Sequence, residues 1–151
     1  MSTLTELQMV YPEIPPTSNK IYFQGTRLTQ HARTYAENFA KYMFEHYGPE
    51  AMQLDKTSAY YIGLRFYFDT LENESFNNPD VPASKRAKSW YKKIDLTNRI
   101  KLLEDCIRDF IDIDDSQTFS ASQEKYQDPG NERVEIHIVA IDATRYGLRR
   151  R

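Results

Sequence analysis

Apolar and polar residues alternate in several stretches of the chain with the period of two that is typical of β-strands. A short first stretch places Leu7, Met9 and Tyr11 on one face. A longer one, residues 58–68, carries five large apolar side chains on one face and predicts a central strand. Residues 118–126 and 133–141 also alternate, and the turn sequence DPGN between them predicts a C-terminal hairpin.

Two other segments repeat their apolar residues every three or four positions, which predicts amphipathic helices. The first begins after Thr29, a candidate N-cap, and we expect it to end at Gly48. The second covers about residues 96–111, with a core-facing stripe of Leu96, Ile100, Leu103, Ile107 and Phe110. The order strand, helix, strand, helix, strand, strand predicts an α+β domain in which two helices pack on a small mixed sheet.

The length of 151 residues predicts one domain, residues 1–151. Residues 71–89 contain two Pro and three Asn without a convincing period, so we expect a long mobile loop there. The lone Cys106 lies on the apolar side of the second helix and is interpreted as a core residue. No apolar run approaches the roughly 18 residues of a membrane span, and the N-terminus lacks signal-peptide features, so we expect a cytoplasmic protein without membrane contact.

The net charge of −2 argues, by itself, against nucleic acid as a partner. The distribution of charge changes that picture, because cations gather in two places. One is a basic tail at residues 145–151, and the other is a nine-residue stretch that contains Lys85, Arg86, Lys88, Lys92 and Lys93. Either group can bind phosphates locally or be a solvated loop and tail.

The acidic residues in and after the second helix have two interpretations. Acids near a helix start favour the helix dipole, and mixed charges solubilise an outer face. Against that reading, Asp112, Asp114 and Asp115 fall within four residues, where carboxylates repel one another unless a cation lies between them. The His residues are scattered and Gln117 stands where a calcium loop needs Gly, which leaves a few-carboxylate site for Mg²⁺ or Mn²⁺.

Two motifs give the chain a family resemblance. The run DLTNRIKLLED followed by IDDSQ resembles the signature of the RusA family of Holliday-junction resolvases, Asp-x-Asp-Asn-x-x-Lys and then Asp-Asp-(Ser/Ala)-Gln. The segment PPTSNKIY is similar to the Pro-Pro-Ser-x-Asn opening of the same family. The resemblance covers nearly the whole chain and implies a homodimeric, Mg²⁺- or Mn²⁺-dependent endonuclease that makes paired nicks in four-way DNA junctions.

The resemblance also assigns roles to residues. It implies catalytic roles for Asp95, Lys101 and Asp115, and metal binding by Asp95, Asp115 and Asp114, with Asp105 and Thr97 as further candidate ligands. It implies DNA binding by Asn19, Asn98 and the basic residues Lys85, Arg86, Lys88, Lys92 and Lys93. For this to work, we expect folding to bring Asp95 and Asp115 close enough to share one divalent ion.

Thr97 stands where the family has its second Asp, so one expected carboxylate is missing. A hydroxyl can coordinate Mg²⁺ as a neutral oxygen, or it can cap the helix. Three hypotheses follow: a junction-resolving nuclease, a non-catalytic junction-binding homodimer of the same fold, and a protein-interaction domain whose acidic helix is only surface.

Overall fold

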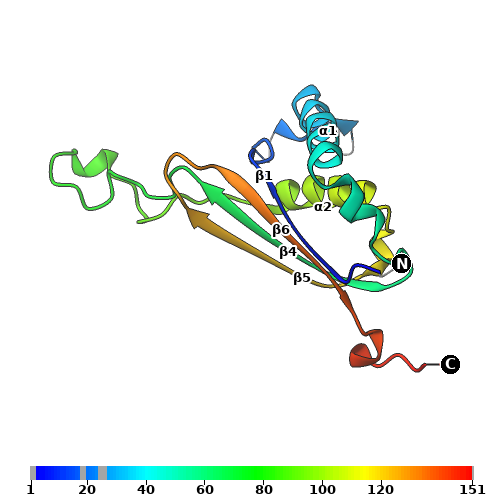
Figure 1. The fold of residues 1–151 in the computed structure, drawn as a ribbon. Helices are drawn as coiled ribbons and strands as arrows, with labels where there is room; N and C mark the ends of the chain where they lie inside the picture. The colour runs from blue at the N-terminus through cyan, green and yellow to red at the C-terminus, as the bar shows by residue number, and fades with distance from the viewer. Residues whose placement is uncertain (1–2, 18–19, 24–26, 151) are drawn as a thin grey trace.

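The computed structural model describes residues 3–17, 20–23 and 27–150, and it places two helices on one face of a four-stranded sheet (Figure 1). The helices are α1 (Gln30–Met52) and α2 (Thr97–Ile111). The sheet contains β1 (Glu6–Tyr11), β4 (Ala59–Phe68), β5 (Thr118–Gln127) and β6 (Arg133–Ile141). The predicted α+β class and element order are confirmed, and a short ribbon of β2 (Tyr22–Phe23) and β3 (Arg27–Leu28) is additional.

The strand order is β1-β6-β4-β5, so the predicted C-terminal hairpin is wrong. Strands β5 and β6 do not pair with each other; both pair with β4, which lies between them. The connection crosses the end of β4, where the Asp128 amide donates to the Phe68 carbonyl at 2.8 Å. Strands β5 and β6 are separated by two strand spacings of about 4.8 Å each, and the loop is long enough to span them. The same turn sequence can therefore form a hairpin between neighbouring strands or a link across β4.

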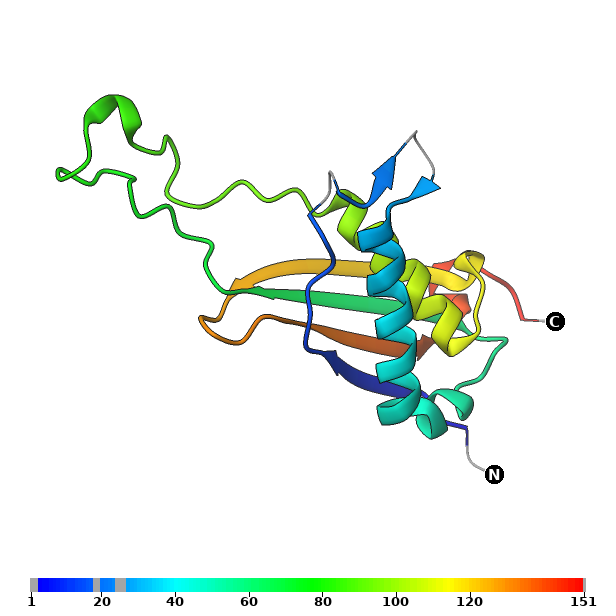
Figure 2. The ribbon, with the colours of Figure 1, turned by 90° about the horizontal axis from the view of Figure 1, so that it is seen from above.

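Strands β4 and β5 are parallel, and α2 is part of the crossover that joins them. A parallel pair needs such a crossover because the chain must return to the end where the first strand began. Helix α2 therefore runs back along the sheet, antiparallel to β5 (Figure 2). Its C-terminal end leads through the 114–117 turn directly into the start of β5.

The core lies between the helices and the sheet. The alternation predicted for β4 is confirmed, since Tyr60, Ile62, Leu64, Phe66 and Phe68 are all buried. Helix α1 contributes Phe39 and Met43 to the same cluster. The buried stripe of α2 is shifted from the predicted one: it contains Leu102, Leu103, Cys106, Ile107, Ile111 and one charged residue, Arg99.

Helix α1 begins as predicted, because the Thr29 hydroxyl accepts a hydrogen bond from the Ala32 amide at 3.2 Å. It does not end at Gly48 but continues through Pro49 to Met52. A residue before proline is normally kept out of the helical region partly by its Cβ. Glycine has no Cβ, so Gly48 lets the helix pass into the proline.

Lys56 holds the C-terminal ends of both helices together. Its ammonium donates to the Ala51 carbonyl of α1 at 2.8 Å and to the Ile111 carbonyl of α2 at 2.6 Å. The Ala51 carbonyl also accepts from the backbone amides of Gln53 and Leu54 just after the helix, and a cation at this place favours both helix dipoles. One side chain therefore links α1 to the C-terminal end of α2.

We expect Lys56→Met to lower the free energy of unfolding by about 2 kcal/mol, since two charge-assisted bonds are lost and the Ile111 carbonyl loses its side-chain donor. Urea denaturation measures this change. Lys41→Met, on the exposed side of α1, is the control and should change stability little. Equal effects of the two substitutions would contradict this role for Lys56.

Burial raises the pKa of the Cys106 thiol to about 12, with Asp109 and Asp105 adding to the effect. The thiolate is the reactive form, so alkylation of the native protein at pH 8 should be at least roughly a hundredfold slower than alkylation in denaturant. Iodoacetamide labelling followed by mass spectrometry measures both rates. Fast labelling of the folded protein would contradict the burial of this residue.

Candidate nucleic-acid and metal site

Asp95 lies two residues before Thr97, the first residue of α2, and accepts hydrogen bonds from it. Its Oδ1 accepts from the Thr97 amide at 2.9 Å and from the Thr97 hydroxyl at 2.8 Å. These two bonds lower the pKa of Asp95, with a smaller contribution from the charge of Lys125. The result is an exposed, ionised carboxylate at the positive end of the α2 dipole.

The same Asp-x-Thr geometry occurs twice more in the chain. Asp55 accepts from the amide and hydroxyl of Thr57, and Asp142 accepts from the amide and hydroxyl of Thr144. The arrangement is therefore a local turn that this sequence uses repeatedly. Thr97 does not cap α2 with its own side chain; its hydroxyl donates to Asp95 instead.

Lys125 holds the segment that leads into α2. It belongs to β5, and its ammonium donates to the Ile94 carbonyl at 3.1 Å. This contact places the Asp95 turn beside the C-terminal end of β5. Sequence reasoning missed Lys125 because it lies thirty residues after Asp95 and belongs to no motif.

Arg99 connects the two family-like motifs in space. Its side chain is buried with 7% exposure, its Nε donates to the Pro16 carbonyl at 3.1 Å, and its guanidinium lies 5.4 Å from the centre of the Phe68 ring. Burial lowers the pKa of Arg99. The loop containing Pro16 is thereby held against the N-terminal part of α2. Projection on the helix could have found Arg99, since it falls within the buried stripe.

Asn19 lies outside the described residues, and Asn98 is half-buried in the first turn of α2. Lys101 is exposed on the outer face of the helix, with its ammonium 4.8 Å from the centre of the Tyr22 ring. Asp105 forms an ion pair with Arg108 at 2.8 Å. The helix therefore directs Lys101 toward the β2–β3 ribbon, while the Asp105 carboxylate stabilises the outer face of α2.

The DDSQ segment after α2 forms a tight turn. Asp114 caps the 3₁₀ turn η3 (Asp115–Gln117) by accepting from the amide and the hydroxyl of Ser116, bonds that lower its pKa. Gln117 donates to the carbonyls of Lys56 and Ser58 at 2.8 and 2.9 Å. These bonds attach the turn to the start of β4.

Asp112 also has a structural role in this turn, because it ends α2 in the left-handed conformation with φ of 57°. Two of the three crowded carboxylates, Asp112 and Asp114, thus belong to residues that shape the turn. Asp115 is exposed in η3. Crowding of acids in this segment is therefore not by itself an indication of a metal ion.

The structure does not bring Asp95 and Asp115 together within one chain. They lie beyond opposite ends of α2, whose 15 residues span about 22 Å at 1.5 Å per residue. The sheet gives the same separation: Asp95 lies near Lys125 and Asp115 precedes Thr118, seven residues of β5 apart, or about 23 Å. The expectation that one chain holds one ion between these two carboxylates is therefore corrected.

The donor chemistry at each end of α2 suits a hard divalent cation, because the available groups are carboxylate and hydroxyl oxygens. Their number is too small: nowhere in residues 3–17, 20–23 and 27–150 do three His, Cys, Asp or Glu side chains gather as a metal site. A single chain thus offers two partial sites rather than one complete site.

Residues 69–94 form an arm that projects from the body of the molecule (Figures 1 and 2). The arm carries all five basic residues expected to bind DNA: Lys85, Arg86, Lys88, Lys92 and Lys93. Arg86 donates to the Val81 carbonyl at 2.8 Å and helps to shape the tip, whereas the four lysines are exposed. A cluster of exposed positive charge therefore lies in residues 85–93 of the arm, outside α2. In the basic tail, Arg150 pairs with Asp142 at 3.1 Å.

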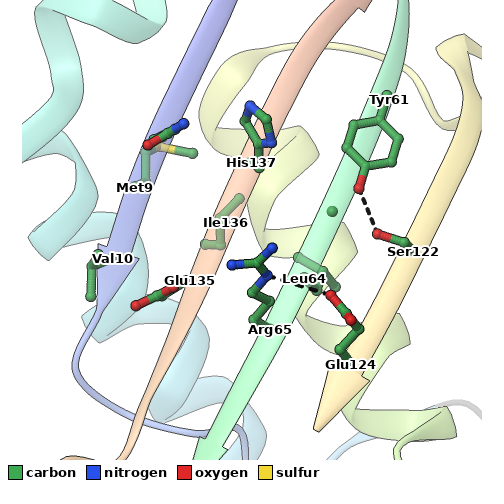
Figure 3. Close-up of a pocket in the computed structure, with 12 residues that line it drawn as sticks. Met9, Val10, Tyr61, Leu64, Arg65, Ser122, Glu124, Glu135, Ile136 and His137 are labelled. Carbon is green, nitrogen blue, oxygen red and sulfur yellow. Dashed lines mark hydrogen bonds and ion pairs between the residues drawn. The ribbon is translucent and has the colours of Figure 1, made fainter. Parts of the chain in front are cut away.

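The open face of the sheet, opposite the helices, carries a hollow of about 530 Å³ (Figure 3). Arg65 pairs there with Glu124 at 3.4 Å, and the Tyr61 hydroxyl bonds Ser122 at 2.6 Å. A side chain at Gly63 would collide with that hydroxyl, since its Cβ would lie 2.5 Å away. None of the residues predicted for the nuclease site lines this hollow.

In the described part of the chain, no helix has the length and apolar character that crossing a membrane requires. Comparison with curated proteins found no match. Among solved structures, the chain is similar to the periplasmic domain of Helicobacter pylori MotB, with 18% identity, a TM-score of 0.35, and coverage of 97% of this chain and 90% of that one. At that TM-score the likeness supports no argument about fold or function.

The family model for endodeoxyribonuclease RusA matches residues 13–139. The match contains the loop of Pro16, the projecting arm, α2 with Asp95, and the DDSQ turn. The match covers most of the chain. It includes both family-like motifs, which the Arg99 side chain connects in space. The protein belongs to the RusA family of endodeoxyribonucleases, the Holliday-junction resolvases.

Proposed function

We propose that this protein is a Mg²⁺- or Mn²⁺-dependent endonuclease that resolves four-way DNA junctions by paired nicks and works as a homodimer. The family match over residues 13–139 carries the proposal. A junction has local two-fold symmetry, and a two-fold dimer presents two equivalent sites to it. Residues 85–93 of the projecting arm support DNA as the substrate, because they carry five cations and no acid although the chain has a net charge of −2.

The separation of the two carboxylates supports a metal site built from two chains. Asp95 of one chain would then share an ion with the partner's Asp115. In such a site the ion would supply an activated water and neutralise charge on the phosphate. The chain's own contribution at Asp95 is a carboxylate kept ionised by Thr97 and Lys125 and fixed against the helix start.

Lys101 supports the same assignment from the outer face of α2. It is exposed and lies one turn beyond Thr97 on the same side of the helix. An ammonium in this position can approach a phosphate bound near Asp95 and stabilise developing negative charge. Lys92 and Lys93, just before Asp95, would attract the DNA backbone toward carboxylates that otherwise repel it.

A second candidate is a non-catalytic homodimer that binds junctions. The observation that favours it is Thr97, which contributes a hydroxyl already donated to Asp95 rather than a second carboxylate. Each site then has about one negative charge fewer for holding a divalent ion. This candidate predicts junction binding without cleavage in either metal.

Mixing two inactive variants separates a two-chain site from a one-chain site. Asp95→Asn and Asp115→Asn should each abolish nicking when tested alone. In a heterodimer of the two variants, one shared site would carry both substitutions and the other would carry none. Such a heterodimer has one intact site where the wild-type dimer has two, so it should cut one strand rather than a symmetric pair. We therefore expect the mixture to regain nicking, at up to about half of the wild-type number of cuts per heterodimer, measured on labelled junctions.

The control for this experiment mixes two differently tagged copies of Asp95→Asn, which should stay inactive. An inactive mixture of the two different variants, with heterodimers shown by tag capture, would contradict the shared site. Persistent cutting by both variants alone would contradict the nuclease assignment itself.

Thr97→Asp tests whether the missing carboxylate limits the enzyme. A further charged ligand should lower the Mn²⁺ concentration needed for half-maximal nicking by about tenfold, because the ion gains an ionic ligand. Thr144→Asp is a matched control, since Thr144 makes the same two hydrogen bonds to Asp142 far from α2. An unchanged metal requirement in Thr97→Asp, or an equal shift in the control, would contradict a ligand position at residue 97.

A further inference from the structure

The projecting arm is built from two paired chain segments. Glu72 and Tyr91 form an antiparallel bridge, and the Lys92 amide donates to the Leu71 carbonyl at 2.7 Å. Beyond the bridge, the Asn73 amide donates to the Trp90 carbonyl at 2.9 Å. The base of the arm is therefore hydrogen-bonded much as a two-stranded ribbon is.

Asn73 fixes the backbone on both sides of Trp90. Its side-chain amide donates to the carbonyls of Ser89 and Tyr91, each at 3.0 Å, in addition to the backbone bond to Trp90. The Ser89 hydroxyl also donates to the Tyr91 carbonyl at 2.6 Å. Four hydrogen bonds thus hold a three-residue segment whose side chains include two large aromatic rings.

Those two rings are exposed. Trp90 is 69% exposed and Tyr91 is 58% exposed, although large aromatic side chains are usually among the more buried residues. Because both rings are exposed, packing of the core does not explain why they lie on the arm. A rigidly held, exposed aromatic pair is a surface that binds at low entropic cost, because the backbone is already ordered.

The charges next to the rings along the chain indicate what they bind, while Glu72 on the paired segment accepts a hydrogen bond from Gln127. Residues 88–93 read KSWYKK, with exposed lysines on both sides of the aromatic pair and no acidic residue between them. Aromatic rings for stacking, combined with cations for the backbone, are the usual means by which proteins bind unpaired nucleotides. The complementary ligand is a polyanion with exposed bases.

The position of the pair along the chain connects it to the proposed cutting site. Trp90 is five residues before Asp95, so its Cα lies within roughly 17 Å of Asp95 even in fully extended chain. That distance corresponds to about five base steps of a DNA strand at 3.4 Å each. An aromatic ring on the arm can therefore contact bases within about five nucleotides of a phosphate that lies near Asp95.

We propose that Trp90 and Tyr91 stack on unpaired bases at the branch point of the junction, while Lys88, Lys92 and Lys93 bind the adjoining phosphates. This inference rests on the proposed function for its DNA substrate and goes beyond it by naming the group that reads the open branch point. Duplex DNA offers phosphates but no exposed base faces, so stacking distinguishes a junction from an intact helix.

Trp90 is the only tryptophan of the chain, so intrinsic tryptophan fluorescence reports on this residue alone. The test titrates the full-length protein, without divalent metal and with EDTA, against a four-way junction and against duplex DNA of equal nucleotide content. We expect the junction to quench Trp90 emission by stacking and the duplex to leave it nearly unchanged. Gel-shift binding is measured on the same samples.

Trp90→Ala should weaken junction binding by about tenfold, which is within the range for losing one stacked base, and should change duplex binding little. Trp90→Phe should restore most of the affinity because its ring can still stack. The matched control is Phe44→Ala, which removes a 71% exposed aromatic side chain from α1, outside the arm, and should not alter binding.

Three results would overturn the stacking proposal: bound junction with unchanged Trp90 emission, equal quenching by duplex, or wild-type affinity in Trp90→Ala. Absence of junction binding at low salt would also overturn it. Failure of the nuclease proposal would instead appear as a junction complex that quenches Trp90 but is not nicked when Mn²⁺ is added. The two failures are thus distinguishable.

Discussion

The length and rigidity of α2 determine how far apart the candidate carboxylates Asp95 and Asp115 lie. The helix is the last part of the crossover that returns the chain from the end of β4 to the start of the parallel strand β5, so its axis runs along the sheet. Contacts secure both ends: Lys125 and Arg99 near the N-terminus, and Lys56 and the Gln117 turn near the C-terminus. A helix held in this way cannot bend to bring its ends together, which makes the separation of Asp95 from Asp115 a property of the fold.

The same constraint supports the proposal of a dimer. A divalent ion needs several oxygen ligands at short distance, and one chain places its carboxylates at two distant points. Two copies related by a two-fold axis would bring unlike ends of two α2 helices together and complete two identical sites. In the proposed complex the arm adds exposed lysines and aromatic rings to the groups on α2.

The sequence predicted the local features of this structure well, because they depend on short-range patterns. The Thr29 cap, the buried face of β4 and the bounds of α2 follow from alternation and helical spacing. The sequence could not predict which strands pair, because the DPGN turn has the same form in a hairpin and in a link across β4. It also could not show that Asp95 and Asp115 lie far apart. The two parts of the motif are close in sequence, but the helix between them separates them in space. Arg99 and Lys125 became visible only when distant segments packed together.

A distance measurement within one chain tests this account most directly. Spin labels on Asp95→Cys and Asp115→Cys, in a Cys106→Ala background and diluted with unlabelled protein, report the intrachain separation by pulsed electron resonance. The account predicts a main distance above about 20 Å, set by the 15 residues of α2. A main distance below about 10 Å would show that one chain brings both carboxylates to a single ion and would contradict it.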